Sequence, residues 1–174
     1  LTLAVILIIL LAAGCQRAGE VSDFEPAASP DPPAAETPVA AADDIVNPSQ
    51  TYSYEQMIAD AQRLAQAYPD LIETESIGRS VEGRELLLVR LGTGGKKILL
   101  LGAHHAREYI TATFLMETAD EYARACVSGG QFGGYDITAL LKEVTVYIVP
   151  MVNPDGVNLV QNGVEAAADP EKVK

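Results

Sequence analysis

The fold is decided by the stretch KKILLLGAHHAREYI, residues 96–110. Its start, Lys96 to Leu101, predicts a strand buried on both faces, because the apolar run after the two lysines is continuous and glycine bounds the segment on both sides. Glu108 to Arg124 predicts a helix, since apolar residues recur there at mostly three- and four-residue spacings. The residues between strand and helix therefore lie at the carboxyl end of a strand, where open α/β sheets gather their active sites.

Helices and strands also alternate on both sides of this stretch. Ser53 and Gln56 have the spacing of a capping box, which predicts the start of a helix. Val144 to Val152 predicts a second buried strand, and the following Asn153-Pro154-Asp155-Gly156 predicts a turn because proline and glycine favour one. The other predicted elements are, in chain order, a helix over 54–68, a hairpin of strands over 73–77 and 84–91, and a short helix over 136–142. This order predicts an α/β fold whose sheet is at least partly parallel.

The composition of the 174 residues excludes some classes of protein. By length the chain has room for one domain, and its net charge of −12 argues against a nucleic-acid surface, which needs clustered lysine and arginine. Half of that charge lies in residues 16–50, which hold seven acidic residues, one basic residue and six of the ten prolines. We expect residues 16–50 to form a disordered tether and the folded domain to occupy residues 51–174.

The first fifteen residues have the composition of a targeting segment. Leu1 to Leu11 is almost entirely apolar but shorter than the roughly 20 residues that cross a bilayer as a helix, so it suits the core of a secretory signal. It leads into Ala12-Ala13-Gly14-Cys15, which resembles the lipobox of bacterial lipoproteins and implies a lipid on Cys15. We therefore expect a secreted or cell-envelope lipoprotein whose signal peptide ends at Cys15 and begins upstream of Leu1. The alternative is a buried helix with a chance cysteine.

His105 and Glu108 are candidate metal ligands. One residue lies just before the predicted helix and the other in its first turn, so that imidazole and carboxylate can converge on one point. Both groups are good zinc ligands, at about 2.0 to 2.2 Å. The alternative is that Glu108 only complements the positive end of the helix while His105 fills the loop.

The order of strand, loop and helix around these two residues resembles the first zinc-ligand signature of the zinc carboxypeptidase family, typified by carboxypeptidase A. The segment Val149-Pro150-Met151-Val152-Asn153-Pro154-Asp155-Gly156 and the helix over 54–68 are also similar to that family, so the resemblance runs from about Tyr52 to Asn162. Residues 52–91 look most like bacterial members, including those that cut γ-D-glutamyl bonds to diamino acids in cell-wall peptides. The resemblance implies a three-layer α/β sandwich with a mixed sheet, one Zn²⁺ ion, and hydrolysis of peptide bonds, with peptides or murein peptides as substrates.

The resemblance also assigns roles to individual residues. His105 and Glu108 match the first two zinc ligands of a site that, in carboxypeptidase A, consists of two histidines and a glutamate. Arg107 matches an arginine that contacts substrate near the reacting carbonyl. The alternative for Arg107 is a surface arginine, although the helix dipole disfavours a cation at a helix start. His104 matches no ligand and is expected to pack or to support the site.

The family's second histidine, its catalytic glutamate and its Asn-Arg pair match no residue of this chain, which has two histidines in all. We therefore expect no catalytic residue here, and expect the chain to be the N-terminal part of a longer peptidase, inactive and weakly zinc-binding by itself. Asn153 and Asp155 are expected to be structural, and Cys126 a small buried thiol. Two alternatives stay open: a peptide-binding envelope lipoprotein that has lost catalysis, and an envelope domain without metal.

Overall fold

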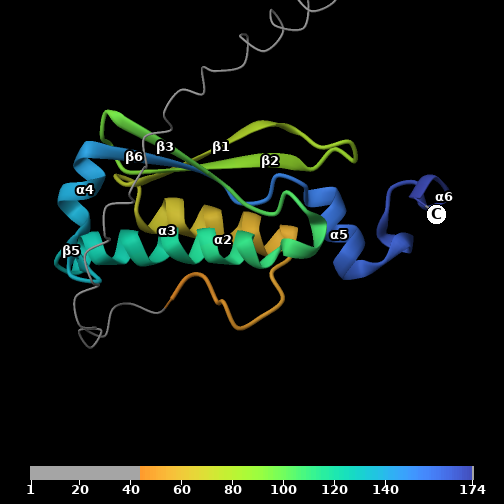
Figure 1. The fold of residues 1–174 in the computed structure, drawn as a ribbon, viewed down its shortest axis with the longest axis horizontal. Coiled ribbons are helices and arrows are strands. Elements are labelled where there is room, and N and C mark those ends of the chain that lie inside the picture. Colours follow the sequence, from red (N-terminus) through yellow and green to blue (C-terminus); the bar gives the residue numbers. More distant parts are fainter. Residues whose placement is uncertain (1–43, 174) are drawn as a thin grey trace, which may run out of the picture. The chain divides into compact units, whose positions relative to one another are not determined.

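The structure, a computed structural model, describes residues 44–173. Its elements are α2 (Tyr54–Ala67), β1 (Ile72–Arg79), β2 (Glu85–Leu91), β3 (Lys96–Leu101), η1 (Ala106–Glu108), α3 (Ile110–Ser128), β4 (Gln131–Phe132), β5 (Tyr135–Asp136), α4 (Ile137–Glu143), β6 (Val144–Val149), α5 (Pro154–Asn162), η2 (Val164–Ala166) and α6 (Pro170–Val173) (Figure 1). The expected signal peptide with Cys15, and residues 16–43 of the expected tether, lie outside the described residues. Between residues 44 and 173, no helix combines the length and the apolar composition needed to cross a membrane.

Four strands form one sheet in the order β1-β2-β6-β3. β1 and β2 pair as an antiparallel hairpin, in which Ile72 lies opposite Leu91. β6 is antiparallel to β2 and parallel to β3, so that Val146 lies between Leu91 and Ile98. This arrangement confirms the expected α/β fold with a mixed, partly parallel sheet.

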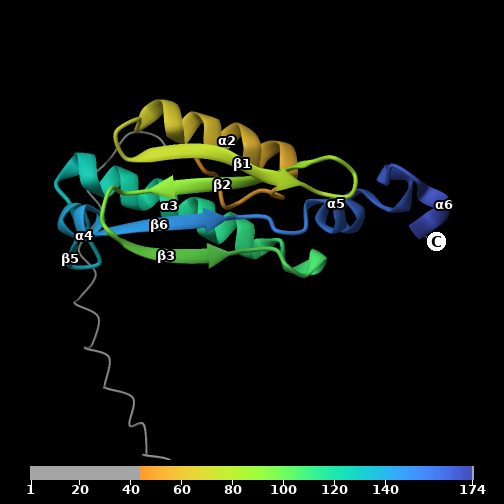
Figure 2. The ribbon, with the colours of Figure 1, turned by 90° about the horizontal axis from the view of Figure 1, so that it is seen from above.

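Helices α2 and α3 lie side by side along one face of the sheet (Figures 1 and 2). α2 begins as its capping pattern predicts, because Ser53 Oγ accepts a hydrogen bond from Gln56 N at 3.2 Å. The two helices and the strands enclose the core, whose fully buried members include Met57, Leu64, Met116, Ala119, Val89 and Ile148. In the described part of the chain, these helices form the layer on one face of the expected sandwich.

β3 is exposed, although its apolar run predicts burial on both faces. Ile98, Leu99 and Leu101 are 48%, 59% and 48% exposed. The reason is the strand order, which places β3 at the edge of the sheet formed by residues 44–173, with β6 on one side. An apolar run shows which side chains a strand can bury, but pairing with distant segments decides whether a neighbour covers them. β6, which has a strand on each side, is buried as predicted.

The segment Asn153-Pro154-Asp155-Gly156 starts a helix, which corrects the predicted turn. The strand before it ends at Val149 rather than Val152, and α5 begins at Pro154. Asn153 Oδ1 caps α5 by accepting a hydrogen bond from Gly156 N at 2.9 Å. A side chain at Gly156 would place its Cβ 2.5 Å from Asn153 Nδ2, so the cap requires glycine there. An asparagine followed by a proline at the first helical position is typical of a helix start as well as of a turn.

Residues 44–46, part of the segment that the sequence assigns to the tether, pack against α3. Ile45 N and Val46 N donate hydrogen bonds to Asp120 Oδ2 at 2.7 and 2.9 Å, and Val46 is buried in the core. Asp44 also pairs with Arg124 at 2.6 Å. The packed part of the chain therefore extends at least to Asp44, because a buried acidic side chain on α3 binds the backbone of this segment.

Replacing Asp120 with alanine should destabilise the domain, because two backbone N–H groups lose their acceptor. We expect the free energy of unfolding to fall by about 2 to 3 kcal/mol. Urea denaturation measures this change. Glu117→Ala, on the same helix and partly exposed, is the control and should stay within about 0.5 kcal/mol of the unsubstituted chain. Equal losses in the two variants would contradict the anchoring role of Asp120.

Asp155 joins the first turn of α5 to the β1–β2 turn. Its carboxylate accepts hydrogen bonds from Ser80 Oγ at 2.7 Å, from Glu82 N at 2.9 Å and from Arg84 at 2.7 Å. Burial by itself raises the pKa of Asp155, but the hydrogen bonds from Glu82 N and Ser80, together with the hydrogen bond and charge of Arg84, outweigh it. The pKa of this carboxyl is therefore held below its usual value.

A carboxyl whose pKa is lower in the folded state stabilises the fold above its unfolded pKa, and this stabilisation is lost as the pH falls through the folded pKa. We therefore expect Asp155→Asn to lower the free energy of unfolding at neutral pH by about 1 to 3 kcal/mol. Between neutral pH and about pH 3, the difference from the unsubstituted chain should shrink. Thermal unfolding at several pH values measures it, with exposed Asp70→Asn as the control. A difference that stays constant over this range would contradict the assignment.

Candidate metal centre

The loop between β3 and α3 is held by the residues that follow β6. Gly102 N donates to Val149 O at 2.9 Å, and Val152 N donates to Gly102 O at 3.0 Å. A side chain at Gly102 would place its Cβ 2.5 Å from Pro150 O, so the close approach of the two segments requires glycine. The loop therefore leaves the sheet beside the carboxyl end of β6, where both strands point the same way (Figure 2).

Ala103 redirects the chain from the strand into the loop. It is buried and has a φ of +46°, a conformation that residues other than glycine adopt only when their surroundings hold them there. Its carbonyl accepts a hydrogen bond from Asn153 N at 3.1 Å, and its N–H donates to Thr111 Oγ1 at 2.7 Å. The backbone just before the two histidines is thus fixed from two sides.

His105 and Glu108 come together on this loop. His105 is extended and immediately precedes the short turn η1, which ends at Glu108. His105 Nδ1 and Glu108 Oε2 are 2.9 Å apart, and the two side chains are 80% and 58% exposed. An imidazole nitrogen and a carboxylate oxygen that meet at an accessible position fit the donor types that zinc prefers.

His104 and Arg107, which directly precede His105 and Glu108, are also exposed. Arg107 lies in η1 between the two candidate ligands. The side chain of His104 is exposed rather than packed, which leaves the other expectation, that His104 supports the site. Its backbone carbonyl instead accepts a hydrogen bond from Asn153 Nδ2 at 3.3 Å.

Cys126 and Asp155 belong to other parts of the fold. Cys126 is half-buried at the end of α3, and burial raises the pKa of its thiol, which keeps the sulfur protonated near neutral pH. Asp155 is engaged with the β1–β2 turn, so its expected structural role is borne out. Neither side chain contributes to the loop that carries His105.

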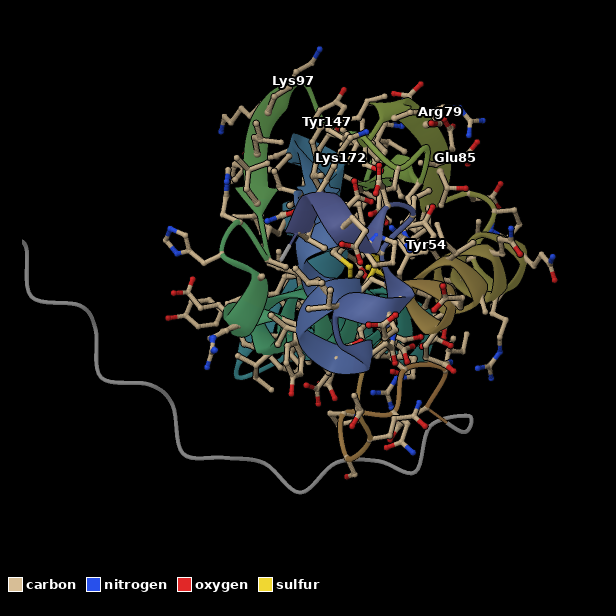
Figure 3. All side chains as sticks on the ribbon, turned by 90° about the vertical axis from the view of Figure 1, so that its right-hand side faces the viewer. Tyr54, Arg79, Glu85, Lys97, Tyr147 and Lys172 are labelled. Atoms are coloured by element: carbon tan, nitrogen blue, oxygen red, sulfur yellow. The ribbon has the colours of Figure 1, made fainter. Side chains whose placement is uncertain are left out.

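An open pocket of about 530 Å³ lies between the start of α2 and the β1–β2 turn. Tyr54, Arg79 and Glu85 are among its lining residues, and Figure 3 shows them across the molecule from Lys97 of β3. Arg79 is paired with Glu85 at 3.0 Å, so these charges compensate each other. None of the residues that line the pocket belongs to the loop over 102–109, so the two are separate features.

The described chain brings two candidate ligands together, and no group of three His, Cys, Asp or Glu side chains forms a metal site among residues 44–173. A catalytic zinc site of the expected type needs a third protein ligand. Sequence reasoning proposed both candidate donors and expected Asn153 to be structural, but it missed Thr111, which holds their loop. The available signal for Thr111 is its position three residues after Glu108, from which a hydroxyl can reach a carbonyl of the preceding turn.

Known proteins match the part of the chain that contains this loop. The zinc carboxypeptidase family model matches residues 57–171. Gamma-D-glutamyl-L-diamino acid endopeptidase 1 of Lysinibacillus sphaericus is 39% identical over 68% of this chain and 30% of its own length. Carboxypeptidase B of Astacus astacus is 34% identical over 60% of this chain and 33% of its own length. The chain thus spans about a third of the length of these curated relatives.

Solved structures share the fold. Thrombin activatable fibrinolysis inhibitor superposes with a TM-score of 0.59 at 24% identity, over 66% of this chain and 28% of its own. Carboxypeptidase A from Helicoverpa armigera superposes with a TM-score of 0.54 at 20% identity, over 70% of this chain and 29% of its own. At these identities the likeness shows the fold alone. The family model, however, matches well over half of the chain, and the chain therefore belongs to the zinc carboxypeptidase family.

Proposed function

We propose that this chain provides two zinc ligands, His105 and Glu108, to a zinc-dependent metallopeptidase that hydrolyses peptide bonds. The observation that supports this most is the 2.9 Å distance between His105 Nδ1 and Glu108 Oε2 on an exposed loop at the carboxyl end of β3. Membership of the family supports zinc as the metal. When bound, zinc supplies a Lewis acid that polarises a carbonyl group and activates water.

The chain's own residues would bind the ion and orient the substrate. Neutral imidazole and ionised carboxylate are the forms in which His105 and Glu108 are donors. Arg107 is exposed and follows His105 by two residues, so its guanidinium can donate two parallel hydrogen bonds to an oxygen-bearing group of a peptide bound beside the ion. We assign Arg107 to substrate binding on this ground.

A narrower substrate class is the γ-D-glutamyl bond to a diamino acid in murein stem peptides. It is supported by the name and the 39% identity of the Lysinibacillus sphaericus relative. A cell-envelope location, which the lipobox-like residues 12–15 suggest, agrees with this substrate because murein lies outside the cytoplasmic membrane. A free carboxylate or amine of the diamino acid would distinguish such a peptide from an ordinary dipeptide.

Glu108→Gln tests the metal site, because it removes the charged donor and keeps the size of the side chain. We expect weak Zn²⁺ binding by the unsubstituted chain and an affinity lower by about tenfold or more in the variant. An NMR titration with Zn²⁺, followed at the His105 imidazole, measures both affinities. Glu117→Gln on α3 is the matched control and should bind as the unsubstituted chain does. A Zn²⁺ response at His105 that Glu108→Gln leaves unchanged would contradict the proposal.

Arg107→Ala tests substrate binding in the zinc-saturated chain. L-Ala-γ-D-Glu-diaminopimelate and a dansylated dipeptide are titrated separately. We expect the murein peptide to bind more tightly, and Arg107→Ala to weaken it by about tenfold, because a charge-assisted hydrogen bond is lost. Arg107→Lys should restore part of the loss, since it keeps the charge but not the planar fork.

Equal affinity for the two peptides would contradict the murein assignment. If Arg107→Ala binds the murein peptide as tightly as the unsubstituted chain does, the role of Arg107 is contradicted. In the same samples, mass spectrometry should find neither peptide hydrolysed, because two protein donors do not complete the site. Clear turnover would show that His105 and Glu108 are sufficient.

A further inference from the structure

One side chain, Thr111, contacts the loop of His105 and Glu108 at both of its ends. The hydroxyl oxygen accepts a hydrogen bond from Ala103 N at 2.7 Å and donates one to Glu108 O at 2.7 Å. The first contact lies two residues before His105, and the second lies on the other candidate ligand itself. A single hydroxyl in the first turn of α3 thus joins the entry and the exit of the loop.

The position of the two ligand side chains depends on this backbone. Because the side chains of His105 and Glu108 are 80% and 58% exposed, packing against the core does little to orient them. Their mutual position is therefore set by where the loop holds their Cα atoms. The hydrogen bond from Glu108 N to His105 O, at 2.9 Å, closes the turn η1 but does not attach it to the rest of the domain.

The entry of the loop is the part that most needs support. Ala103 has a φ of +46°, which is strained for a residue with a Cβ, and it is buried, so its N–H requires a partner inside the protein. Thr111 Oγ1 is that partner. On the other side, Val152 N and Asn153 N donate to the carbonyls of Gly102 and Ala103, and Asn153 Nδ2 donates to the carbonyl of His104.

We propose that Thr111 is a positioning residue for the metal centre. Its hydroxyl keeps Ala103 in the left-handed conformation and fixes Glu108 relative to it, so that the imidazole and carboxylate face each other before an ion arrives. This inference rests on the proposed metal site, and it adds that the affinity of that site depends on a side chain that touches neither the ion nor the substrate.

Thr111→Val tests the role, because valine keeps the shape of threonine and removes the hydroxyl. Thr118→Val is the matched control: it lies on the same helix, and its hydroxyl also donates to a backbone carbonyl, that of Phe114, at 2.8 Å. Thr111→Ser keeps the hydroxyl and serves as the rescue. The measurements are amide hydrogen exchange at Ala103 and the Zn²⁺ dissociation constant, followed by NMR at the His105 imidazole, in the 174-residue chain.

We expect Thr111→Val to speed exchange at Ala103 by about tenfold and to raise the Zn²⁺ dissociation constant by about tenfold, the size seen when a group that orients a ligand is removed. In Thr111→Ser and in Thr118→Val, both the exchange rate at Ala103 and the Zn²⁺ dissociation constant should stay within about twofold of those of the unsubstituted chain. Thr111→Val leaves the buried Ala103 N–H without its acceptor, so its thermal midpoint should fall by several degrees, whereas Thr111→Ser and Thr118→Val should stay close to the unsubstituted chain. Should Thr111→Val not fold, Thr111→Ala replaces it in the same comparison.

Thr111→Val with the same Ala103 exchange and the same Zn²⁺ dissociation constant as Thr118→Val would overturn the inference. A dissociation constant that rises equally in Thr111→Val and Thr111→Ser would also overturn it, because the hydroxyl would then not be the cause. If the unsubstituted chain shows no Zn²⁺ response at His105, the metal site itself fails, and Thr111 then positions no ligand. That result is distinguishable because it does not involve any Thr111 variant.

Discussion

The parallel pairing of β3 with β6 is the constraint on which the rest of the structure depends. In this register Leu101 lies beside Val149, so both strands end at the same level. Because they run in the same direction, the segments that leave them meet, and backbone hydrogen bonds join 102–103 to 152–153. A shift of the register by one residue would turn every side chain of β3 to the other face and would break these bonds.

The short segment after β6 also organises the two structures beside it. Asn153 uses both ends of its amide, since Oδ1 caps α5 while Nδ2 donates to the carbonyl of His104. Two residues later, Asp155 binds the turn between β1 and β2. Each of these bonds is worth only about 0.5 to 3 kcal/mol, so the arrangement relies on several of them acting together. The loop over 102–109, α5 and the hairpin are thereby fixed to one another.

Features that depend on residues close together in the chain can be predicted from the sequence. Ser53 caps α2 as its spacing predicts, and His105 and Glu108, three residues apart, come together as expected. Features that depend on distant segments are not visible in the sequence. The apolar run of β3 does not show that this strand lies at the edge of the described sheet. The composition around Val46 does not show that this segment binds Asp120. Thr111 is missed for the same reason, because its hydroxyl matters only once Ala103 has been folded back against it.

The exposure of His105 and Glu108 bears on kinetics as well as on affinity. In the proposed site an ion could reach both side chains directly from solvent, since they are 80% and 58% exposed. Because both side chains are open to solvent, a soluble chelator could also reach an ion bound there. In the proposed site, long residence of a metal would therefore need a further donor and surfaces that keep solvent out.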